Sequence, residues 1–195
     1  KKRITDPRIL EGNIENYIGM ACVPVGVIGP LRINGSYAHG DFYVPLATTE
    51  GALIASYNRG AKVISLSGGA RVLCLSERVS RAPGFVFNNL VEAGKFIAWC
   101  VRNFKKFQKC VRSVTSHGRL EDMMTTVDGN QVCLNFQFTT GDAAGQNMVT
   151  IATEAICQLI IFSCPVKPRF WFIESNMSGD KKATAISYLF VRGKK

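Results

Sequence analysis

Residues 120–138, LEDMMTTVDGNQVCLNFQF, decide the fold predicted for this chain. Two runs rich in strand-forming residues, 120–127 and 131–138, flank the dipeptide Asp128-Gly129. An Asp-Gly pair between two such runs is among the strongest short-range signals of a β-hairpin. The stretch therefore predicts two neighbouring antiparallel strands joined by a tight turn.

The segments on either side of this hairpin complete a recognisable pattern. Residues 85–90 favour a strand and residues 91–114 a long helix, whereas residues 142–163 favour a second helix and residues 169–173 a last strand. The order β-α-β-β-α-β is that of a ferredoxin-like sandwich, in which two helices cover one face of an antiparallel sheet. We therefore predict an α+β fold with a ferredoxin-like small domain.

Residues 45–60, PLATTEGALIASYNRG, predict a helix in the other part of the chain. Thr48 and Thr49 are typical N-cap residues, and apolar residues recur after them at helical spacing. Glu50 is then expected in the first turn, where the helix N-terminus favours the charged carboxylate and burial favours the protonated one. A buried glutamate between these influences can donate or accept a proton. The alternative is a glutamate that only complements the helix dipole.

The segment before this helix contains turn-forming residues. Residues 23–31, VPVGVIGPL, hold two glycines and two prolines, which predict a tight extended loop rather than a helix. Residues 31–45 predict a hairpin that turns at Asn34-Gly35.

Composition limits the class of protein and its compartment. The 195 residues are 47% hydrophobic and 19% charged, as in an ordinary globular protein. The seven cysteines are odd in number and include no CxxC pair, so we expect no disulfide framework, no metal site and a reducing compartment, the cytoplasm. No apolar run reaches transmembrane length, so no membrane contact is expected in this segment.

A formal net charge of +10 suits nucleic acid, an anionic membrane or a small polyphosphate ligand. The sequence holds no helix-turn-helix, RNP-type or zinc-finger signature, so a nucleic-acid partner is not expected. The basic run 102–109 predicts a solvated face.

Residues 141–148, GDAAGQNM, form the one glycine-rich candidate for a cofactor site, because the chain has neither a G-x-G-x-x-G nor a Walker A motif. They lie between a predicted strand and a predicted helix, where free backbone N–H groups can bind a phosphate. The alternative is an ordinary helix start with Asp142 as its N-cap.

Together, several segments resemble the hydroxymethylglutaryl-CoA reductase family over about residues 11–194. The segments are ENYIG at 15–19, PVGVIGPL at 24–31, ATTEG at 47–51, GDAAGQNM at 141–148 and NMSGDKK at 176–182. The resemblance implies NADPH-dependent reduction of an acyl-CoA thioester, which in the family is hydroxymethylglutaryl-CoA reduced to mevalonate. It also implies a homodimer whose sites combine a glutamate and a lysine from different chains, with the first segment at the dimer contact and the second lining the substrate region.

The resemblance assigns roles to particular residues. Glu50 would act in proton transfer, and Lys181 would stabilise the oxyanion that forms as hydride arrives. The implied contacts are Arg81, Asn176, Asp180 and Lys182 for the substrate, and Asp142, Gly145 and Asn147 for NADPH. Lys105 and Lys106 are candidates for the ribose phosphate of that cofactor.

The chain departs from the family pattern at both implied binding sites. Glu174 and Ser175 stand where the family has Ser-Gly, and that serine contacts the substrate carboxylate. A glutamate there would repel a carboxylate unless it were protonated or turned away. In the cofactor motif, Ala144 and Gln146 replace methionines.

The resemblance also implies a domain plan. Residues 1–83 would be the N-terminal part of a larger α+β substrate-binding and dimerisation domain, residues 84–173 the inserted small domain, and residues 174–195 the lysine loop and the return to the large domain. The family's further catalytic aspartate and histidine come from a part that follows, so we expect a fragment, one piece of a split enzyme or a natural truncation. Two alternatives are a redox-inactive homologue that uses Glu50 on a thioester or polyketide-like substrate, and a module for binding or assembly only.

Overall fold

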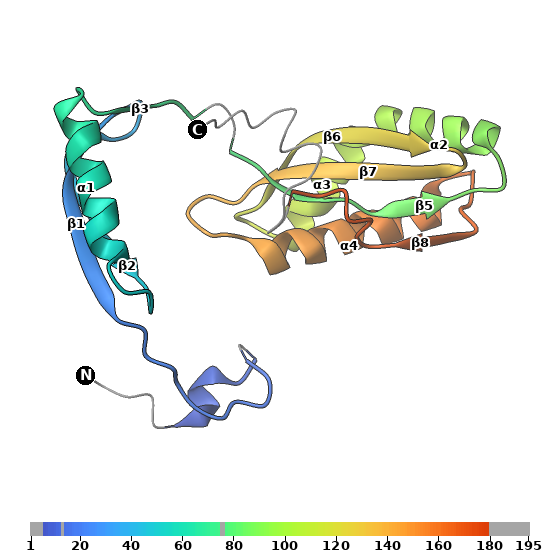
Figure 1. Cartoon of the computed structure of the whole chain (residues 1–195). Coiled ribbons are helices and arrows are strands. Elements are labelled where there is room, and N and C mark those ends of the chain that lie inside the picture. Colours follow the sequence, from blue (N-terminus) through green and yellow to red (C-terminus); the bar gives the residue numbers. More distant parts are fainter. Residues whose placement is uncertain (1–5, 13, 75–76, 180–195) are drawn as a thin grey trace. The chain divides into compact units, whose positions relative to one another are not determined.

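The computed structural model describes residues 6–12, 14–74 and 77–179 (Figure 1). The chain divides into two compact units, Lys1–Cys74 and Leu75–Lys195, here called unit 1 and unit 2. Both combine helices with sheets, so the predicted α+β class is confirmed. No helix among the described residues is long and apolar enough to cross a membrane.

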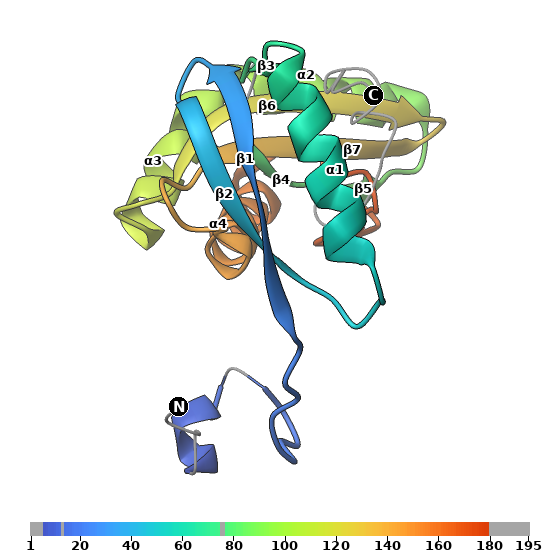
Figure 2. The ribbon, with the colours of Figure 1, turned by 60° about the vertical axis from the view of Figure 1, so that its left-hand side comes forward.

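Unit 1 is a small three-stranded sheet with one long helix. Its elements are the 3-10 helix η1 (Pro7–Leu10), the strands β1 (Val25–Gly35), β2 (His39–Ala47) and β3 (Ala70–Val72), and the helix α1 (Leu53–Leu66). The sheet order is β2-β1-β3, with β2 antiparallel and β3 parallel to β1. Helix α1 runs alongside the β1–β2 hairpin in both views (Figures 1 and 2).

Two local expectations for unit 1 are wrong. The predicted loop 23–31 is paired from Val25 onward as part of β1, because the ladder shifts register between Ile28 and Leu31 and leaves the proline between them outside the pairing. The hairpin turns after Asn34-Gly35 rather than at it: Asn34 pairs with His39, and the Gly35 N–H donates to the Ala38 carbonyl at 2.8 Å.

Unit 2 has the predicted ferredoxin-like order. Its strands are β4 (Val79–Arg81), β5 (Gly84–Val86), β6 (Arg119–Asp128), β7 (Gln131–Thr139) and β8 (Phe170–Phe172), and its helices are α2 (Leu90–Arg102), α3 (Phe104–Val114) and α4 (Gln146–Ser163). The strands lie in the order β8-β5-β7-β6, all antiparallel, and β4 also pairs with β7. The first predicted strand is shorter than expected, because α2 already begins at Leu90 with the Asn89 side chain as its cap.

The single helix predicted over residues 91–114 is two helices that meet at Asn103. This residue ends α2 and precedes α3, and its side-chain amide donates to the Trp99 carbonyl at 2.8 Å. Asparagine competes for backbone hydrogen bonds in this way, which explains why the helix breaks here.

The core of unit 2 lies between the helices and one face of the sheet. Alternate residues of β7 are fully buried on that face, namely Val132, Leu134, Phe136 and Phe138. From the helices, Phe96 packs between Phe85 and Phe87, with ring centroids 4.9 and 4.8 Å apart. The helices thus cover one face of the sheet and leave the face on which Asn135 lies uncovered by them.

Strands β4 and β5 lie end to end along β7 and are separated by residues 82–83. Arg81 pairs with Phe136 and Gly84 with Cys133 in an unbroken register, and the Leu134 N–H donates to the Pro83 carbonyl at 3.0 Å. Because Pro83 has no N–H, the ladder is interrupted there without losing its alignment. Arg81, the last residue of β4, lies beside β7 through its pairing with Phe136.

Candidate functional site

The segment that follows β8 lies against β4 and β7. The Ser175 N–H donates to the Ala82 carbonyl at 2.7 Å, the Asn135 side chain donates to the Met177 carbonyl at 3.2 Å, and the Gly179 N–H donates to the Ser80 hydroxyl at 3.0 Å. Asn135 alternates with the core residues of β7, and Ser80 pairs with Gln137, which does the same, so the two side-chain contacts use the sheet face opposite the helices. The start of the predicted lysine loop is therefore anchored on unit 2.

Only part of that predicted loop can be located. Asn176 is exposed and has a positive φ of 64°, a conformation that asparagine tolerates better than most residues. Asp180, Lys181 and Lys182 lie outside the described residues, so their roles stay predictions. The anchoring residues Ser80 and Asn135 were missed by sequence reasoning, although an asparagine in the apolar run of β7 is a signal that could have drawn attention to it.

Arg81 and Glu174 form an ion pair at the beginning of this loop. The Arg81 Nη1 lies 3.3 Å from the Glu174 Oε2, with the two side chains 13% and 22% exposed. The Arg81 Nη2 donates to the Gln146 Oε1 at 3.4 Å. Arg81 thus joins the start of the lysine loop to the first residue of α4. Glu174, the residue that departs from the family pattern, is turned toward the arginine.

The predicted cofactor loop ends in a helix N-terminus without a side-chain cap. Helix α4 begins at Gln146, four residues later than predicted, and Gly145 precedes it with a left-handed φ of 68°. Asp142 is exposed and does not cap the helix, so the capping alternative is wrong. A Cβ on Gly145 would collide with Thr140, so this close packing and the positive φ both require glycine.

The three residues predicted to contact NADPH lie in this one loop and the first helical turn. Asn147 is exposed in that turn, whose N–H groups receive no side-chain cap. Met148, the residue after Asn147, is contacted by the loop that follows α3: the Thr115 hydroxyl lies 3.0 Å from the Met148 sulfur. Sequence reasoning missed Thr115, because nothing local marks the contact. The arrangement can accept an anion at the start of α4.

Glu50 lies in unit 1, in the turn between β2 and α1. Its N–H donates to the Thr48 hydroxyl at 2.9 Å, and α1 begins only at Leu53, after Ala52 with a left-handed φ of 61°. The expectation of a buried Glu50 in the first helical turn is therefore wrong on both counts, since Glu50 is exposed in this chain. Thr48 satisfies the backbone of the turn and does not cap the helix.

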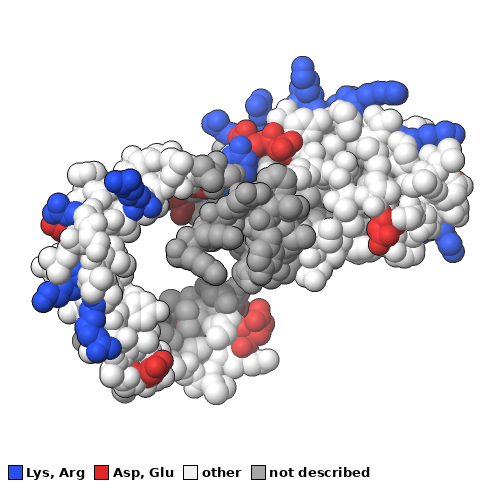
Figure 3. All heavy atoms as spheres, turned by 45° about the horizontal axis from the view of Figure 1, so that its top comes forward, with Lys and Arg blue, Asp and Glu red and all other residues white. Residues whose placement is uncertain are grey.

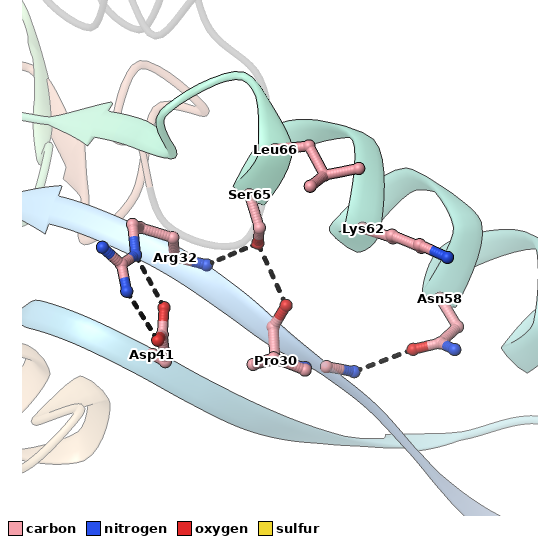
Figure 4. Close-up of a pocket in the computed structure, with 8 residues that line it drawn as sticks. Pro30, Arg32, Asp41, Asn58, Lys62, Ser65 and Leu66 are labelled. Carbon is pink, nitrogen blue, oxygen red and sulfur yellow. Dashed lines mark hydrogen bonds and ion pairs between the residues drawn. The ribbon is translucent and has the colours of Figure 1, made fainter.

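Between β1 and α1 lies a pocket of about 400 Å³ (Figure 4). Its polar groups largely bind one another: the Asn58 side chain accepts from the Gly29 N–H at 2.9 Å, and the Ser65 hydroxyl accepts from the Arg32 N–H at 2.9 Å and donates to the Pro30 carbonyl at 3.0 Å. These side chains satisfy backbone groups at the irregular stretch of β1. They bind α1 to the sheet.

An ion pair closes one side of this pocket. The Arg32 Nε and Nη2 lie 2.8 and 2.7 Å from the two oxygens of Asp41, a bidentate arrangement across β1 and β2. The hydrogen bonds from Arg32 lower the pKa of Asp41 below its ordinary value. The pocket lies beside the segment 24–31 that the resemblance assigns to the substrate region, and that assignment stays a prediction.

Figure 3 shows lysine and arginine side chains spread over the visible surface of both units. Lys105 and Lys106 are exposed in the first turn of α3, so their assignment to a ribose phosphate also stays a prediction. Among the described residues, no group of three or more His, Cys, Asp or Glu side chains could hold a metal ion.

These features define the class of protein: an α+β protein with a ferredoxin-like unit. The polar groups of its candidate site lie on β4 and β7, at the start of α4 and in the loop that follows β8. The family described as hydroxymethylglutaryl-coenzyme A reductase matches residues 1–195. The chain is 45% identical over 191 residues to the 3-hydroxy-3-methylglutaryl-coenzyme A reductase of Pyrococcus abyssi, covering 97% of this chain and 47% of the relative. It is 48% identical over 182 residues to that of Aeropyrum pernix, covering 93% and 43%.

Solved structures show the same fold. A 3-hydroxy-3-methylglutaryl-coenzyme A reductase of Streptococcus pneumoniae matches with a TM-score of 0.71 at 14% identity, covering 86% of this chain and 40% of the other. Another structure of the Streptococcus pneumoniae enzyme, described as bound to NADPH, matches with a TM-score of 0.70 at 17% identity, covering 89% and 47%. The chain belongs to the hydroxymethylglutaryl-coenzyme A reductase family, and it spans about half the length of the curated relatives it matches.

Proposed function

We propose that this chain takes part in the NADPH-dependent reduction of an acyl-CoA thioester, the chemistry of the family to which it belongs. One observation carries the proposal: Arg81 contacts both Glu174, at the start of the lysine loop, and Gln146, at the start of α4. One arginine thereby links the two segments to which the resemblance assigns substrate and cofactor.

The start of α4 suits a phosphate of the cofactor. Its first-turn N–H groups have no side-chain cap, and Gly145 permits the left-handed turn that leads into them. Gly145 and Asn147 would hold the group there, and Asp142 would border it from the loop. NADPH, when bound, supplies the hydride for the reduction.

The remaining chemistry falls to two charged side chains. As a thioester carbonyl accepts hydride, negative charge develops on its oxygen, and the Lys181 ammonium would stabilise that charge. Glu50 would donate or accept the accompanying proton. Its exposure in the single chain leaves it accessible for such a role.

We further propose that the working form is a homodimer in which Glu50 and Lys181 of one site come from different copies. Unit 1 exposes many large apolar side chains that a partner could cover, among them Ile18, Val25, Tyr43 and Leu66. The described residues contain no disulfide bond, which suits our assignment of this chemistry to the reducing cytoplasm. Analytical ultracentrifugation across a concentration series tests the dimer, and a monomer at all concentrations would contradict it.

Calorimetric titration of the chain with NADPH tests the cofactor proposal, and we expect a dissociation constant in the micromolar range. Gly145→Ala should weaken binding by about tenfold or more, because its Cβ collides with Thr140 and displaces the start of α4. Gly141→Ala is the matched control: Gly141 also has a positive φ, of 62°, but its Cβ would meet nothing within 4 Å. A folded chain that binds no NADPH would refute the reductase proposal.

A further inference from the structure

The most informative charged contact in unit 2 is the pair between Arg81 and Glu174. Both side chains are largely buried, at 13% and 22% exposed, and their nearest charged atoms are 3.3 Å apart. The pair has no net charge when both groups are ionised. A guanidinium that could bind a carboxylate of a ligand is therefore already matched by a carboxylate of the chain itself.

Glu174 is also held in place by its backbone. The next residue, Ser175, donates its N–H to the Ala82 carbonyl at 2.7 Å, and Ala82 directly follows Arg81 in the sequence. This hydrogen bond joins two segments that are far apart in the sequence, next to the ion pair. The fixed main chain keeps the Glu174 Cα near Arg81, and the Glu174 Oε2 lies 3.5 Å from the Ala82 nitrogen as well as 3.3 Å from the Arg81 Nη1, so two contacts favour a carboxylate beside the guanidinium.

This arrangement determines what kind of ligand group can lie next to Arg81. An anionic group brought next to Arg81 would meet the Glu174 carboxylate in a partly desolvated place, where like charges side by side are strongly unfavourable. It would bind only if Glu174 were displaced or protonated. A hydroxyl or methyl group carries no such penalty.

We propose that Glu174 is a specificity-determining residue that selects acyl-CoA thioesters whose acyl group carries no carboxylate at this position. This inference rests on the proposed function, because it assumes that the acyl group lies beside Arg81. It differs from that function in naming the chemical class of the acyl group: neutral rather than anionic.

Two thioesters that differ in one carboxylate test the inference. Hydroxymethylglutaryl-CoA carries a terminal carboxylate, whereas 3-hydroxy-3-methylbutyryl-CoA has the same branched hydroxyacyl group without it. Calorimetric titration of the full chain with each compound, and with free CoA as a reference, gives the affinity ratio. We expect the neutral thioester to bind at least about tenfold more tightly, a difference of about 1.4 kcal/mol.

Variants then assign this preference to one side chain. Glu174→Gln keeps the size and removes the charge, and Glu174→Ser also removes bulk; both should lower the preference for the neutral thioester by about tenfold. Glu121→Gln is the matched control, because it removes one exposed carboxylate from the same unit without touching Arg81. It should leave the ratio unchanged.

The outcomes separate the inference from the function on which it rests. If the unaltered chain binds hydroxymethylglutaryl-CoA as tightly as the neutral thioester, the inference is overturned and the reductase proposal stands. If the folded chain binds neither thioester nor CoA, both are overturned. Should the Glu174 variants fail to fold, the ratio measured on the unaltered chain still decides the question.

Discussion

Two glycines of unit 2 should respond in opposite directions to the same substitution. Gly84 lies in β5, paired with Phe172 of β8, and a Cβ added there would collide with Cζ and Cε2 of the Phe172 ring and lie 3.1 Å from Cε1. Its φ is not in the left-handed region, so alanine would meet only this steric obstacle. Gly94 lies in α2 with open space around its Cβ position.

The magnitudes follow from these surroundings. Alanine normally improves on glycine in a regular element by about 0.5–1 kcal/mol, so Gly94→Ala should stabilise unit 2 by that amount. Gly84→Ala should instead destabilise it by about 1–3 kcal/mol, the usual cost of forcing atoms into an occupied space. The gap between the two variants is then about 1.5–4 kcal/mol.

Denaturant unfolding followed by tryptophan fluorescence measures this difference in unfolding free energy in unit 2, where both glycines lie. The chain has two tryptophans, Trp99 and Trp171, and both belong to unit 2. The midpoint should rise for Gly94→Ala and fall for Gly84→Ala at unchanged slope. Equal midpoints for the two variants would refute the packing of Phe172 over Gly84. They would also question the position of β8, which leads directly into Glu174.

The other predictions concern titrating groups. The pKa of Asp41 is lowered by Arg32, so the stability that this pair gives unit 1 is complete above the pKa of the unfolded carboxyl and is lost as the pH falls through the lower native pKa. Asp41→Asn should therefore make acid unfolding of unit 1, followed by tyrosine fluorescence, less steep between these two pKa values. An unchanged profile would contradict the ion pair. Burial raises the pKa of the Cys100 and Cys157 thiols, so both should resist a thiol reagent at pH 8 until the chain unfolds. The exposed Cys22 should react at once, and mass spectrometry of the labelled chain would show the opposite order if the core were open.

The order of elements in unit 2 could be predicted because each segment carries its own periodicity and the hairpin carries its own turn residues. The strand 131–138 alternates, so its buried half was implied by the sequence before any contact was known. The break at Asn103 was missed because it depends on one side-chain hydrogen bond, and the late start of α4 was missed because it depends on the left-handed conformation of Gly145. The free-energy difference between two such local conformations is small, so contacts with the rest of the fold decide between them.

The candidate site was predictable only in its parts. Arg81, the loop 141–148 and Glu174 could each be named from sequence, but the ion pair joins residues 93 positions apart, and no local pattern contains that contact. The error over Glu50 has a related cause. Two threonines before a helical pattern suggest a cap, yet the first of them binds the turn itself, and the left-handed Ala52 delays the helix.

The contact of Arg81 with two partners has a consequence for interpreting the Glu174 variants. If Glu174 served only to hold the loop, its loss would weaken every thioester alike, because a displaced loop would misplace Asn176 and all that follows. If it selects by charge, Glu174→Gln should change the ratio between the anionic and neutral thioesters while free CoA binds as before. Gln146 supports this separation, since it still holds the other arm of Arg81 and keeps the guanidinium near its place when the carboxylate is gone. A common loss of affinity for all three compounds would therefore identify Glu174 as a positioning residue and remove it as the determinant of specificity.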